Sequence, residues 1–445
     1  MARNAKKISS GAISTDHLSA GVLSLCFPMR EIKRILNTCQ FGETRDRNLP
    51  LPVVVFFNIA LCLFPNVAYE NVQSWLFAGL DWLTNSSYKK CVKSAFSYAR
   101  NKLGEAPMKK IFQEFSRPIN DKKIKGSFWK KRLLVALDGS SVSLQDTEEN
   151  RKAFGGPSNQ KGDSAWPMMR FTALLEVGTH IIFDAEIDGY KSSEITMASK
   201  LVSRLKPGML CLADRLFPSF WLWKKAAATG CALVWRTKEC LTLEHVKTLP
   251  DGSWLAHWRP NEKDRRKHPK EVHLVRVVEY QITKKNPSAT EKREESYRLI
   301  TNILEVSEAS AQELAELYPQ RWEIELSFKE IKNVMRKGVV TLRSKTPELV
   351  TQEFWGMMLA HRAVRHGGIE LLHEATLVQH HHAARQGVEQ VVQARGEALL
   401  FVQFAGETGA GGRQLRGEFS DLPLEIGIER GQFAGSVFEL GEGFT

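Results

Sequence analysis

The alternation of apolar runs and polar breaks divides the chain into regions of different periodicity. Residues 20–120 alternate apolar helical segments with short breaks such as Arg45–Pro50, which predicts an all-helical domain. The most apolar segment, Val53–Phe64, has 12 residues and lies between two prolines. A membrane-spanning helix needs about 20 apolar residues, so we expect a buried helix and no membrane contact. Residues 1–19 are polar, and we expect a disordered N-terminus.

Residues 130–238 contain short apolar runs that alternate with amphipathic segments. Runs of this kind are typical of strands buried on both faces. The expected order is strand, strand, strand, helix, strand, helix, strand, over residues 133–138, 169–176, 179–187, 193–205, 209–213, 219–229 and 231–236. This order predicts an α/β domain, to which we assign residues 130–366.

Residues 239–297 break the alternation and predict a mostly β insertion in that domain. Turn-rich segments there separate short strands, and residues 263–270 form a basic loop. Trp254 and Trp258 either fill the small core of the insertion, the alternative we favour, or one of them stacks on an extruded DNA base. Tyr297–Ile303 is expected to be the last strand of the sheet.

Two aspartates end apolar runs of the α/β domain. Asp138 follows Leu133–Leu137, and Asp214 follows Met209–Ala213. An acidic residue at the carboxyl end of a buried strand lies where open α/β sheets bind ligands. Each residue alone could equally open a turn or cap a helix. Both together favour a shared site.

The segment Tyr318–Lys332 has helical periodicity with a polar stripe beside an apolar one. At about 100° per residue, Tyr318, Arg321, Glu325 and Lys332 fall within about 60° of one another. The apolar stripe consists of Leu317, Ile324, Phe328, Ile331 and Met335. A carboxylate flanked by two cations suits a metal ion together with a polyanion, although a salt-bridged surface helix gives the same pattern.

Charge and cysteine content narrow the class of partner and the compartment. The formal net charge is +12 over 445 residues, and such an excess favours nucleic acid or another polyanion. The seven cysteines contain no C-x-x-C pair, which favours a reducing cytosol over a disulfide framework or a zinc site.

Several ordered motifs make residues 20–366 resemble the insertion sequence 4 family of bacterial DDE transposases. Tyr318, Arg321, Glu325 and Lys332 match the family signature Y-x2-R-x3-E-x6-K at every position. The surrounding motifs also match in order, namely Asp138–Ser140, Asp146–Asn150, Phe154–Gly155, Arg170–His180, Ser193–Glu194, Ala213–Arg215, Thr229–Gly230 and Trp235–Lys238.

The resemblance implies a ribonuclease-H-like catalytic core in which the strands of the first two aspartates are neighbours. Its catalytic and metal-binding residues are Asp138, Asp214 and Glu325, and Tyr318, Arg321 and Lys332 bind a DNA phosphate. Carboxylate ligands without histidine or cysteine suit two Mg²⁺ ions, for which Mn²⁺ can substitute.

The resemblance also implies the partners of the chain. They are double-stranded DNA, both the terminal inverted repeats and the target, and a second copy of the chain in a homodimer. The helical domain, residues 20–120, is expected to grip the end of the element, or else only to cap the catalytic domain. The compartment is the bacterial cytoplasm, at the nucleoid. A ribonuclease-H-like nuclease and an inactive remnant that only binds DNA are the alternative functions.

The last part of the chain departs from the family in composition. Residues 346–445 contain no lysine and hold 7 arginines against 13 acidic residues. Family-like sequence stops near His366, and glycine becomes frequent afterwards. We hypothesise that residues 367–445 are an atypical tail produced by a shifted reading frame, in which case the family's C-terminal helices are missing.

Overall fold

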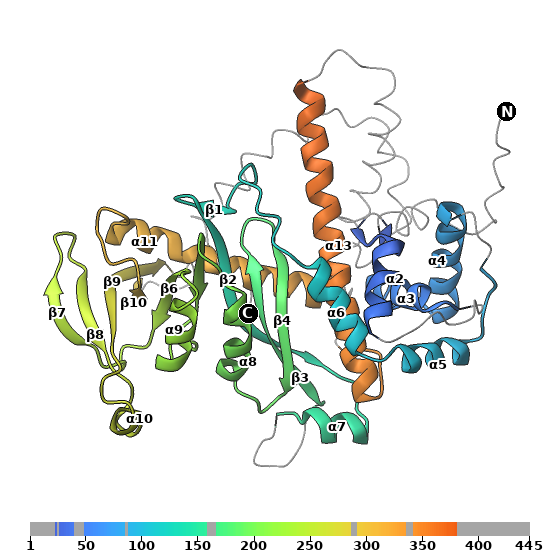
Figure 1. Ribbon diagram of the computed structural model, residues 1–445, viewed down its shortest axis with the longest axis horizontal. Helices are drawn as coiled ribbons and strands as arrows, with labels where there is room; N and C mark the ends of the chain where they lie inside the picture. The colour runs from blue at the N-terminus through green and yellow to red at the C-terminus, as the bar shows by residue number, and fades with distance from the viewer. Residues whose placement is uncertain are drawn as a thin grey trace. The chain divides into compact units, whose positions relative to one another are not determined.

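The computed structural model describes residues 23–39 apart from Leu25, 49–84, 88–157, 166–285, 292–334 and 341–380. The expected disordered N-terminus, residues 1–19, lies outside them, as do residues 381–445 of the tail. The chain forms two compact units (Figure 1). The first contains the described residues up to Leu233 and those from Tyr318 onward, and the second contains Val234–Leu317.

The first unit begins with helices, as the sequence predicted. They are α2 (Met29–Thr38), α3 (Leu51–Leu63), α4 (Tyr69–Thr84), α5 (Lys93–Leu103) and α6 (Ala106–Phe115). Helix α3 holds the apolar segment and is buried along most of its length, because a helix that is apolar all round has no face for water. None of the helices in the described residues is long and apolar enough to cross a membrane.

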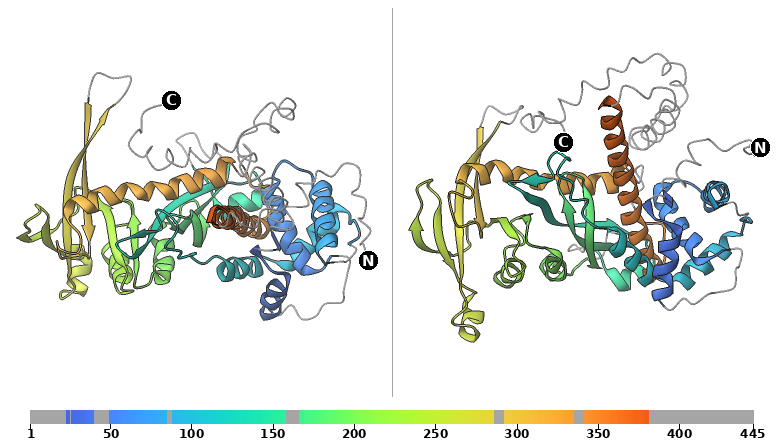
Figure 2. Two further views of the ribbon diagram at one scale, coloured as in Figure 1. Left: turned by 90° about the horizontal axis from the view of Figure 1, so that it is seen from above. Right: turned by 45° about the horizontal axis from the view of Figure 1, so that its top comes forward.

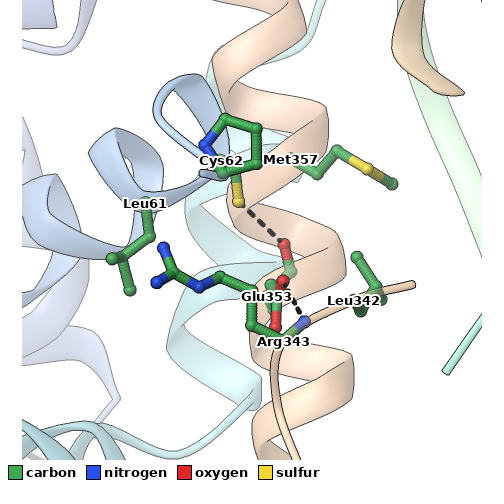
Figure 3. Close-up of a pocket in the computed structure, with 7 residues that line it drawn as sticks. Leu61, Cys62, Leu342, Arg343, Glu353 and Met357 are labelled. Atoms are coloured by element: carbon green, nitrogen blue, oxygen red, sulfur yellow. Dashed lines mark hydrogen bonds between the residues drawn. The ribbon is translucent and has the colours of Figure 1, made fainter. Parts of the chain in front are cut away.

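The long helix α13 (Pro347–His380) packs against three of these N-terminal helices, α3, α5 and α6 (Figures 1 and 2). Gly356 allows α3 to approach closely, since a Cβ at this position would lie 3.0 Å from the Asn58 carbonyl oxygen. Figure 3 shows the same seam, where the Cys62 thiol donates to the Glu353 carbonyl oxygen. The Glu353 carboxylate in turn accepts the backbone N–H of Arg343 at 2.9 Å.

A buried arginine makes a second tie between α5 and α13. Arg100 is 3% exposed, and its guanidinium donates to the Gln352 side-chain oxygen and to the Ser344 hydroxyl, both at 3.0 Å. The Gln352 amide donates back to the Arg100 carbonyl oxygen at 2.9 Å. Because each buried polar group finds a partner, the network specifies one docking of α5 on α13.

The sheet of the first unit has the strand order β4-β3-β2-β5. Strands β2 (Arg132–Ser143), β3 (Met168–Glu176) and β4 (Ile181–Gly189) are antiparallel neighbours, whereas β5 (Met209–Ala213) runs parallel to β2. The short β1 (Phe128–Trp129) pairs with β2. This order and these directions are those of the ribonuclease-H-like fold, so the predicted fold class is confirmed.

The two predicted helices follow the strands in the expected order, and a further short helix between the first two predicted strands was not predicted. Helix α7 (Glu148–Phe154) follows β2, and α8 (Glu194–Leu201) follows β4, continuing as the 3-10 turn η1 (Val202–Arg204). Helix α8 packs on β3 and β4, and α13 also contacts β4. Helix α9 (Phe220–Ala227) leads to β6 (Ala232–Thr237), where the chain passes into the second unit.

The second unit is an antiparallel sheet with strand order β6-β10-β9-β8-β7. The strands are β7 (Glu244–Thr248), β8 (Trp254–Trp258), β9 (His273–Lys285) and β10 (Lys292–Thr301), with helices α10 (Glu262–Lys267) and α11 (Ala311–Leu317). Trp258 is 3% exposed and belongs to the core, while the Trp254 indole N–H donates to Glu279 at 3.3 Å. The described strands β7 to β10 therefore give this region the mostly β character that the sequence predicted.

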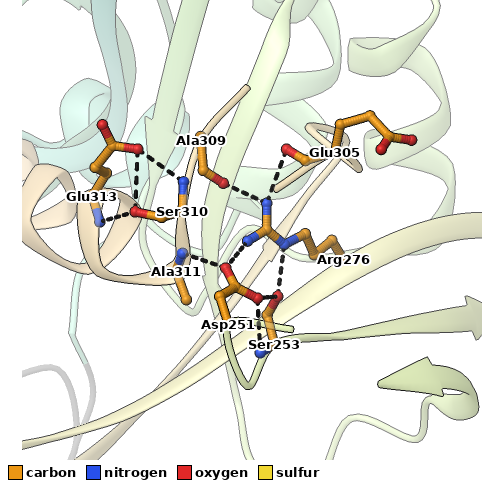
Figure 4. A network of polar contacts seen from close by, with 8 residues as sticks. All are labelled: Asp251, Ser253, Arg276, Glu305, Ala309, Ser310, Ala311 and Glu313. Atoms are coloured by element: carbon orange, nitrogen blue, oxygen red, sulfur yellow. Dashed lines mark hydrogen bonds and ion pairs between the residues drawn. The ribbon is translucent and has the colours of Figure 1, made fainter. Parts of the chain in front are cut away.

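A buried arginine at the centre of this unit joins the β7–β8 turn to the start of α11 (Figure 4). Arg276 on β9 is fully buried and donates to the Asp251 carboxylate, to the Ser253 hydroxyl at 2.8 Å and to the Ala309 carbonyl oxygen at 2.6 Å. Asp251 also accepts the backbone N–H of Ala311 at 2.7 Å, which satisfies a free donor at the start of α11. One ion pair therefore fixes the start of α11 against the β7–β8 turn.

Candidate active site

The two predicted aspartates lie on neighbouring parallel strands. Leu137 of β2 pairs with Ala213 of β5, so the residues that follow them, Asp138 and Asp214, are adjacent at the point where β5 ends. Strand β2 does not end at Asp138, as the sequence suggested, but continues to Ser143 because β3 keeps pairing with it as far as Met168. Asp138 therefore lies within a rigid strand, and its side chain is 13% exposed.

The segment that carries Glu325 is not one regular α-helix, which corrects the sequence prediction. It consists of a 3-10 turn η2 (Tyr318–Arg321), the α-helix α12 (Trp322–Lys329) and a π-helical turn η3 (Glu330–Val334). Pro319 explains the first irregularity, because proline has no N–H for the helical ladder and its ring clashes with the preceding turn. The apolar stripe is nonetheless buried at Leu317, Ile324, Phe328 and Ile331. Met335 lies outside the described residues.

Arg321 joins two of the three carboxylates. Its guanidinium donates to Asp138 at 3.2 Å and to Glu325 at 2.7 Å, and its side chain is 6% exposed. Asp138 and Glu325 are 187 positions apart in the sequence and meet at this one cation. The structure thus gathers the first aspartate, the glutamate and the arginine of the predicted signature.

Burial and the negative charges of neighbouring carboxylates disfavour ionisation of the Asp138 carboxyl group. Burial raises the pKa of Asp138 to about 7, against the opposing effects of the Gly139 backbone N–H and of Arg321. The charges of Glu325 and Asp214 raise this pKa further. A site that concentrates negative charge in this way is stabilised by added positive charge.

Lys332 and Tyr318 contact the two strands that carry the aspartates. The Lys332 ammonium donates to the Ser140 hydroxyl on β2, and burial lowers the pKa of Lys332 while the charge of Asp138 acts to raise it. Tyr318 is 3% exposed, and its hydroxyl donates to the Ala213 carbonyl oxygen on β5 at 3.3 Å. All six predicted site residues therefore lie around the β2–β5 pair, with Tyr318 turned toward the backbone.

The donor set of this site suits a divalent cation. Its candidate ligands are carboxylates only, which hard cations prefer, and their mutual repulsion is visible at Asp138. Among the residues that the structure describes, no three His, Cys, Asp or Glu side chains are grouped closely enough to hold a metal ion. The Arg321 guanidinium lies between two of the candidate ligands, Asp138 and Glu325.

A second polar cluster, which the sequence analysis missed, anchors the helix on both sides of Glu325. His180, in the turn between β3 and β4, contacts Glu323 at 2.7 Å and Glu330 at 3.5 Å. Glu330 also contacts His361 at 3.6 Å and forms an ion pair with Arg365, both on α13. Glu323 and Glu330 are seven positions apart and so share one helix face. This spacing is the one feature of the sequence that points to the cluster. Their partners are too distant in the chain to be inferred.

Glu330 should contribute measurably to stability. Despite its burial, the close contacts with His180 and His361 and the charge of Arg365 hold the pKa of Glu330 well below its usual range. The charged form therefore stabilises the fold above the unfolded-state pKa of about 4.3, and this contribution is lost as the pH falls through the folded-state pKa. We expect Glu330→Gln to lower the free energy of unfolding by roughly 2 kcal/mol at pH 7.

Urea unfolding at two pH values checks this expectation. The difference between wild type and Glu330→Gln should narrow on acidification from pH 7 to about pH 3. Glu149→Gln, at an exposed position of α7, is the control and should change stability little. A difference of the same size at both pH values would contradict the role assigned to the Glu330 charge.

The amino-acid sequence of the chain matches two protein-family models and known relatives. The family model described as "Transposase DDE domain" matches residues 129–362, and the model "Insertion element 4 transposase N-terminal" matches residues 17–113. The chain is 26% identical over 342 residues to "Transposase InsG for insertion sequence element IS4" of Escherichia coli (strain K12), covering 76% of this chain and 74% of the relative.

Two further proteins are similar to the chain. "Putative transposase InsZ" of the same organism is 26% identical over 219 residues, which cover 49% of this chain and 71% of that protein. A solved structure of the piggyBac transposase synaptic complex with hairpin DNA aligns with 92% of this chain and 86% of its own, at 13% identity and a TM-score of 0.38.

Proposed function

Because the chain belongs to the DDE transposases of the insertion sequence 4 family, enzymes that cut DNA strands and join them elsewhere, we propose that its catalytic residues are Asp138, Asp214 and Glu325. The contact that supports this choice most strongly is that of Arg321, which reaches Asp138 and Glu325 at once. The parallel pairing of β2 with β5 adds Asp214 to the same place. The proposed reaction is cut-and-paste transposition, with cleavage at the ends of an element followed by transfer to target DNA.

Transposases with this domain use divalent metal ions, and we propose two Mg²⁺ ions, with Mn²⁺ as a substitute. Asp138 would be a ligand of both ions, and Asp214 and Glu325 would each be a ligand of one. When bound, the ions activate the attacking oxygen and stabilise the leaving oxygen at the phosphodiester. The three carboxylates would hold the ions, and the pairing of β2 with β5 fixes the positions of Asp138 and Asp214 relative to each other.

The basic residues of the signature are proposed to bind a DNA phosphate. Arg321 can offer a phosphate the same two N–H groups that it now directs at Asp138 and Glu325, in the bidentate geometry that guanidinium groups favour. Lys332 adds a second positive charge beside β2. The Tyr318 hydroxyl can contact a phosphate only if it breaks its hydrogen bond to the Ala213 carbonyl oxygen. A phosphate and the metal ions would thus replace the two internal ion pairs of Arg321.

The proposed partners follow from this chemistry. They are the double-stranded terminal inverted repeats of the element, its target DNA and a second copy of the chain in a homodimer. We assign DNA-end binding to the N-terminal helical domain, residues 20–120, whose α3 and α6 pack on α13 of the catalytic domain. Because the substrates are chromosomal DNA, we place the protein in the bacterial cytoplasm, at the nucleoid.

End-specific nicking tests the proposed function. The purified chain is incubated with Mg²⁺ and a linear DNA that carries one end of its element, and cuts are mapped on a denaturing gel. A DNA of equal length with a scrambled end is the control. We expect cuts at the element boundary only. Binding without cutting would identify a DNA-binding remnant, and cutting equally well at the scrambled end would identify a general nuclease.

A further inference from the structure

The turn between β1 and β2 has an unusual sequence for its backbone geometry. Trp129 pairs with Arg132, so the loop consists of Lys130 and Lys131 alone. Both residues have positive φ angles, 44° and 69°. A two-residue loop with this geometry is a type I′ turn, in which asparagine and glycine are strongly preferred. Two lysines in this turn are strained, because their side chains disfavour the left-handed conformation.

Residues 122–132, the basic hairpin, carry a high density of positive charge. They include six basic residues and no acidic residue. Five of the six are lysines with exposed side chains, namely Lys122, Lys123, Lys125, Lys130 and Lys131. The Lys130 ammonium lies 5.1 Å from the centroid of the Trp129 ring. In the part of the chain that the structure describes, the other four lysines form no ion pair with an acidic side chain. Their charge is therefore open to a partner.

Buried contacts fix the backbone that leads into the basic hairpin. The Glu176 carboxylate at the end of β3 is fully buried and accepts the backbone N–H groups of Ile119 and Asn120 at 2.7 and 3.1 Å. Next to β3, Gly178 lets the chain pass closely, since a Cβ there would lie 2.3 Å from the Ser127 backbone nitrogen. The lysines therefore extend from a backbone of fixed shape, which lowers the entropy cost of binding a partner.

We propose that the basic hairpin is a DNA-binding surface of the first unit, at which exposed lysines hold phosphates of duplex DNA outside the cleavage site. A strained turn that carries two lysines is explained if their charge is needed at this place. The inference rests on the proposed function, which makes duplex DNA the polyanion. The alternative is that the lysines only keep the edge of the sheet from aggregating.

The position of the basic hairpin suits contact with the same duplex that enters the active site. Arg132 and Asp138 are both on β2 and are six positions apart. At about 3.3 Å per residue the hairpin lies about 20 Å from the first aspartate. This distance corresponds to roughly six base pairs of B-DNA. One duplex is therefore long enough to contact both places.

The salt dependence of DNA binding by the full-length chain tests the inference. Affinity for labelled end DNA is measured by fluorescence anisotropy between 50 and 200 mM salt, without divalent metal. Lys130→Asn/Lys131→Gly should bind more weakly and lower the slope of log affinity against log salt concentration by about 2, because each phosphate contact contributes about 0.9. The deficit relative to wild type should be about tenfold larger at 50 mM than at 200 mM salt.

Two further readouts of the same variant separate DNA binding from folding. The thermal unfolding midpoint should equal or exceed that of wild type, because asparagine and glycine relieve the strain of the turn. Scrambled DNA of equal length should show the same deficit as end DNA, because phosphate contacts carry no sequence information. A deficit confined to end DNA would contradict a phosphate-binding surface.

Lys200→Gln/Lys206→Gln is the matched control, since it removes two exposed lysines of the first unit at another place. Its slope should stay within about 0.5 of wild type. An unchanged slope in the hairpin variant overturns the inference, as does an equal loss of slope in the control. If wild type binds no DNA, the proposed function fails and the inference with it. If wild type binds DNA without nicking its end and the hairpin variant still loses slope, only the proposed reaction fails.

Discussion

Replacing Asp138 with asparagine is expected to slow DNA strand cleavage by at least about a thousandfold, since metal-assisted displacement loses a shared ligand. The amide has almost the same shape as the carboxylate, so the strand and its pairing with β5 should persist. DNA affinity should change little, because Arg321 and Lys332 stay in place. The measurement is single-turnover nicking of end DNA, together with DNA affinity in a Ca²⁺ buffer.

The same substitution should not destabilise the metal-free protein. Burial raises the pKa of Asp138 to about 7, so its charge is unfavourable in the folded state at neutral pH. We therefore expect Asp138→Asn to unfold at the temperature of wild type or above, which is typical of residues kept for function at the expense of stability. Asp188→Asn, at an exposed position of β4, is the control and should cleave normally. Undiminished cleavage by Asp138→Asn would remove Asp138 from the site.

Arg276→Ala is expected to lower the free energy of unfolding of the second unit by about 3–5 kcal/mol, the range for breaking a buried charge pair. The guanidinium is fully buried and has four acceptors, which are Asp251, Ser253, Glu305 and Ala309. Without it, Asp251 keeps a charge that no cation compensates, and two carbonyl oxygens lose their donor. The start of α11 should loosen as well.

Urea unfolding followed by hydrogen exchange in β9 and α11 measures this effect. Arg266→Ala in the same unit is the matched control. The Arg266 side chain is 78% exposed, so its ion pair with Glu262 should contribute little to the free energy of unfolding. If both variants lose the same small amount of stability, the buried network does not hold the unit together. Faster hydrogen exchange of backbone amides in the second unit alone would agree with the division of the chain into two units.

Local patterns in the sequence were sufficient for the strands that carry the aspartates, whereas the pairing of these two strands was implied by the family resemblance. The runs that end in Asp138 and Asp214 are buried on both faces, and such runs have few alternatives to a central strand. The apolar stripe of Leu317, Ile324, Phe328 and Ile331 was likewise predicted, because helical periodicity depends on nearby residues only. In these cases the cause lies within a few positions of the effect.

Features that depend on distant partners could not be predicted in this way. The π-helical turn at Glu330–Val334 occurs where Glu330 is held by His180 and by two residues of α13. In the sequence Arg276 is a single basic residue within a strand, and the side chain of such a residue is usually expected to be exposed to solvent. Glu194 was noted only as part of a motif, because nothing in the sequence places it over Gly139. Long-range contacts decide each of these.

The hypothesis of a shifted reading frame concerns residues that are largely outside the described part of the chain. The backbone of α13 is helical to His380, and the transposase family model ends at residue 362. An intact catalytic site and an atypical tail are compatible, since the carboxylates, Arg321 and Lys332 all precede residue 345. Activity and the origin of the tail are therefore separate questions.

The most direct test of the proposed site is an anomalous-scattering map of crystals of the full chain with Mn²⁺ and a DNA end. The account predicts manganese peaks within ligand distance of the Asp138, Asp214 and Glu325 carboxylates, with Arg321 moved from Asp138 to a phosphate. Peaks elsewhere, or an Arg321 that still joins Asp138 to Glu325 while DNA is bound and cut, would contradict it.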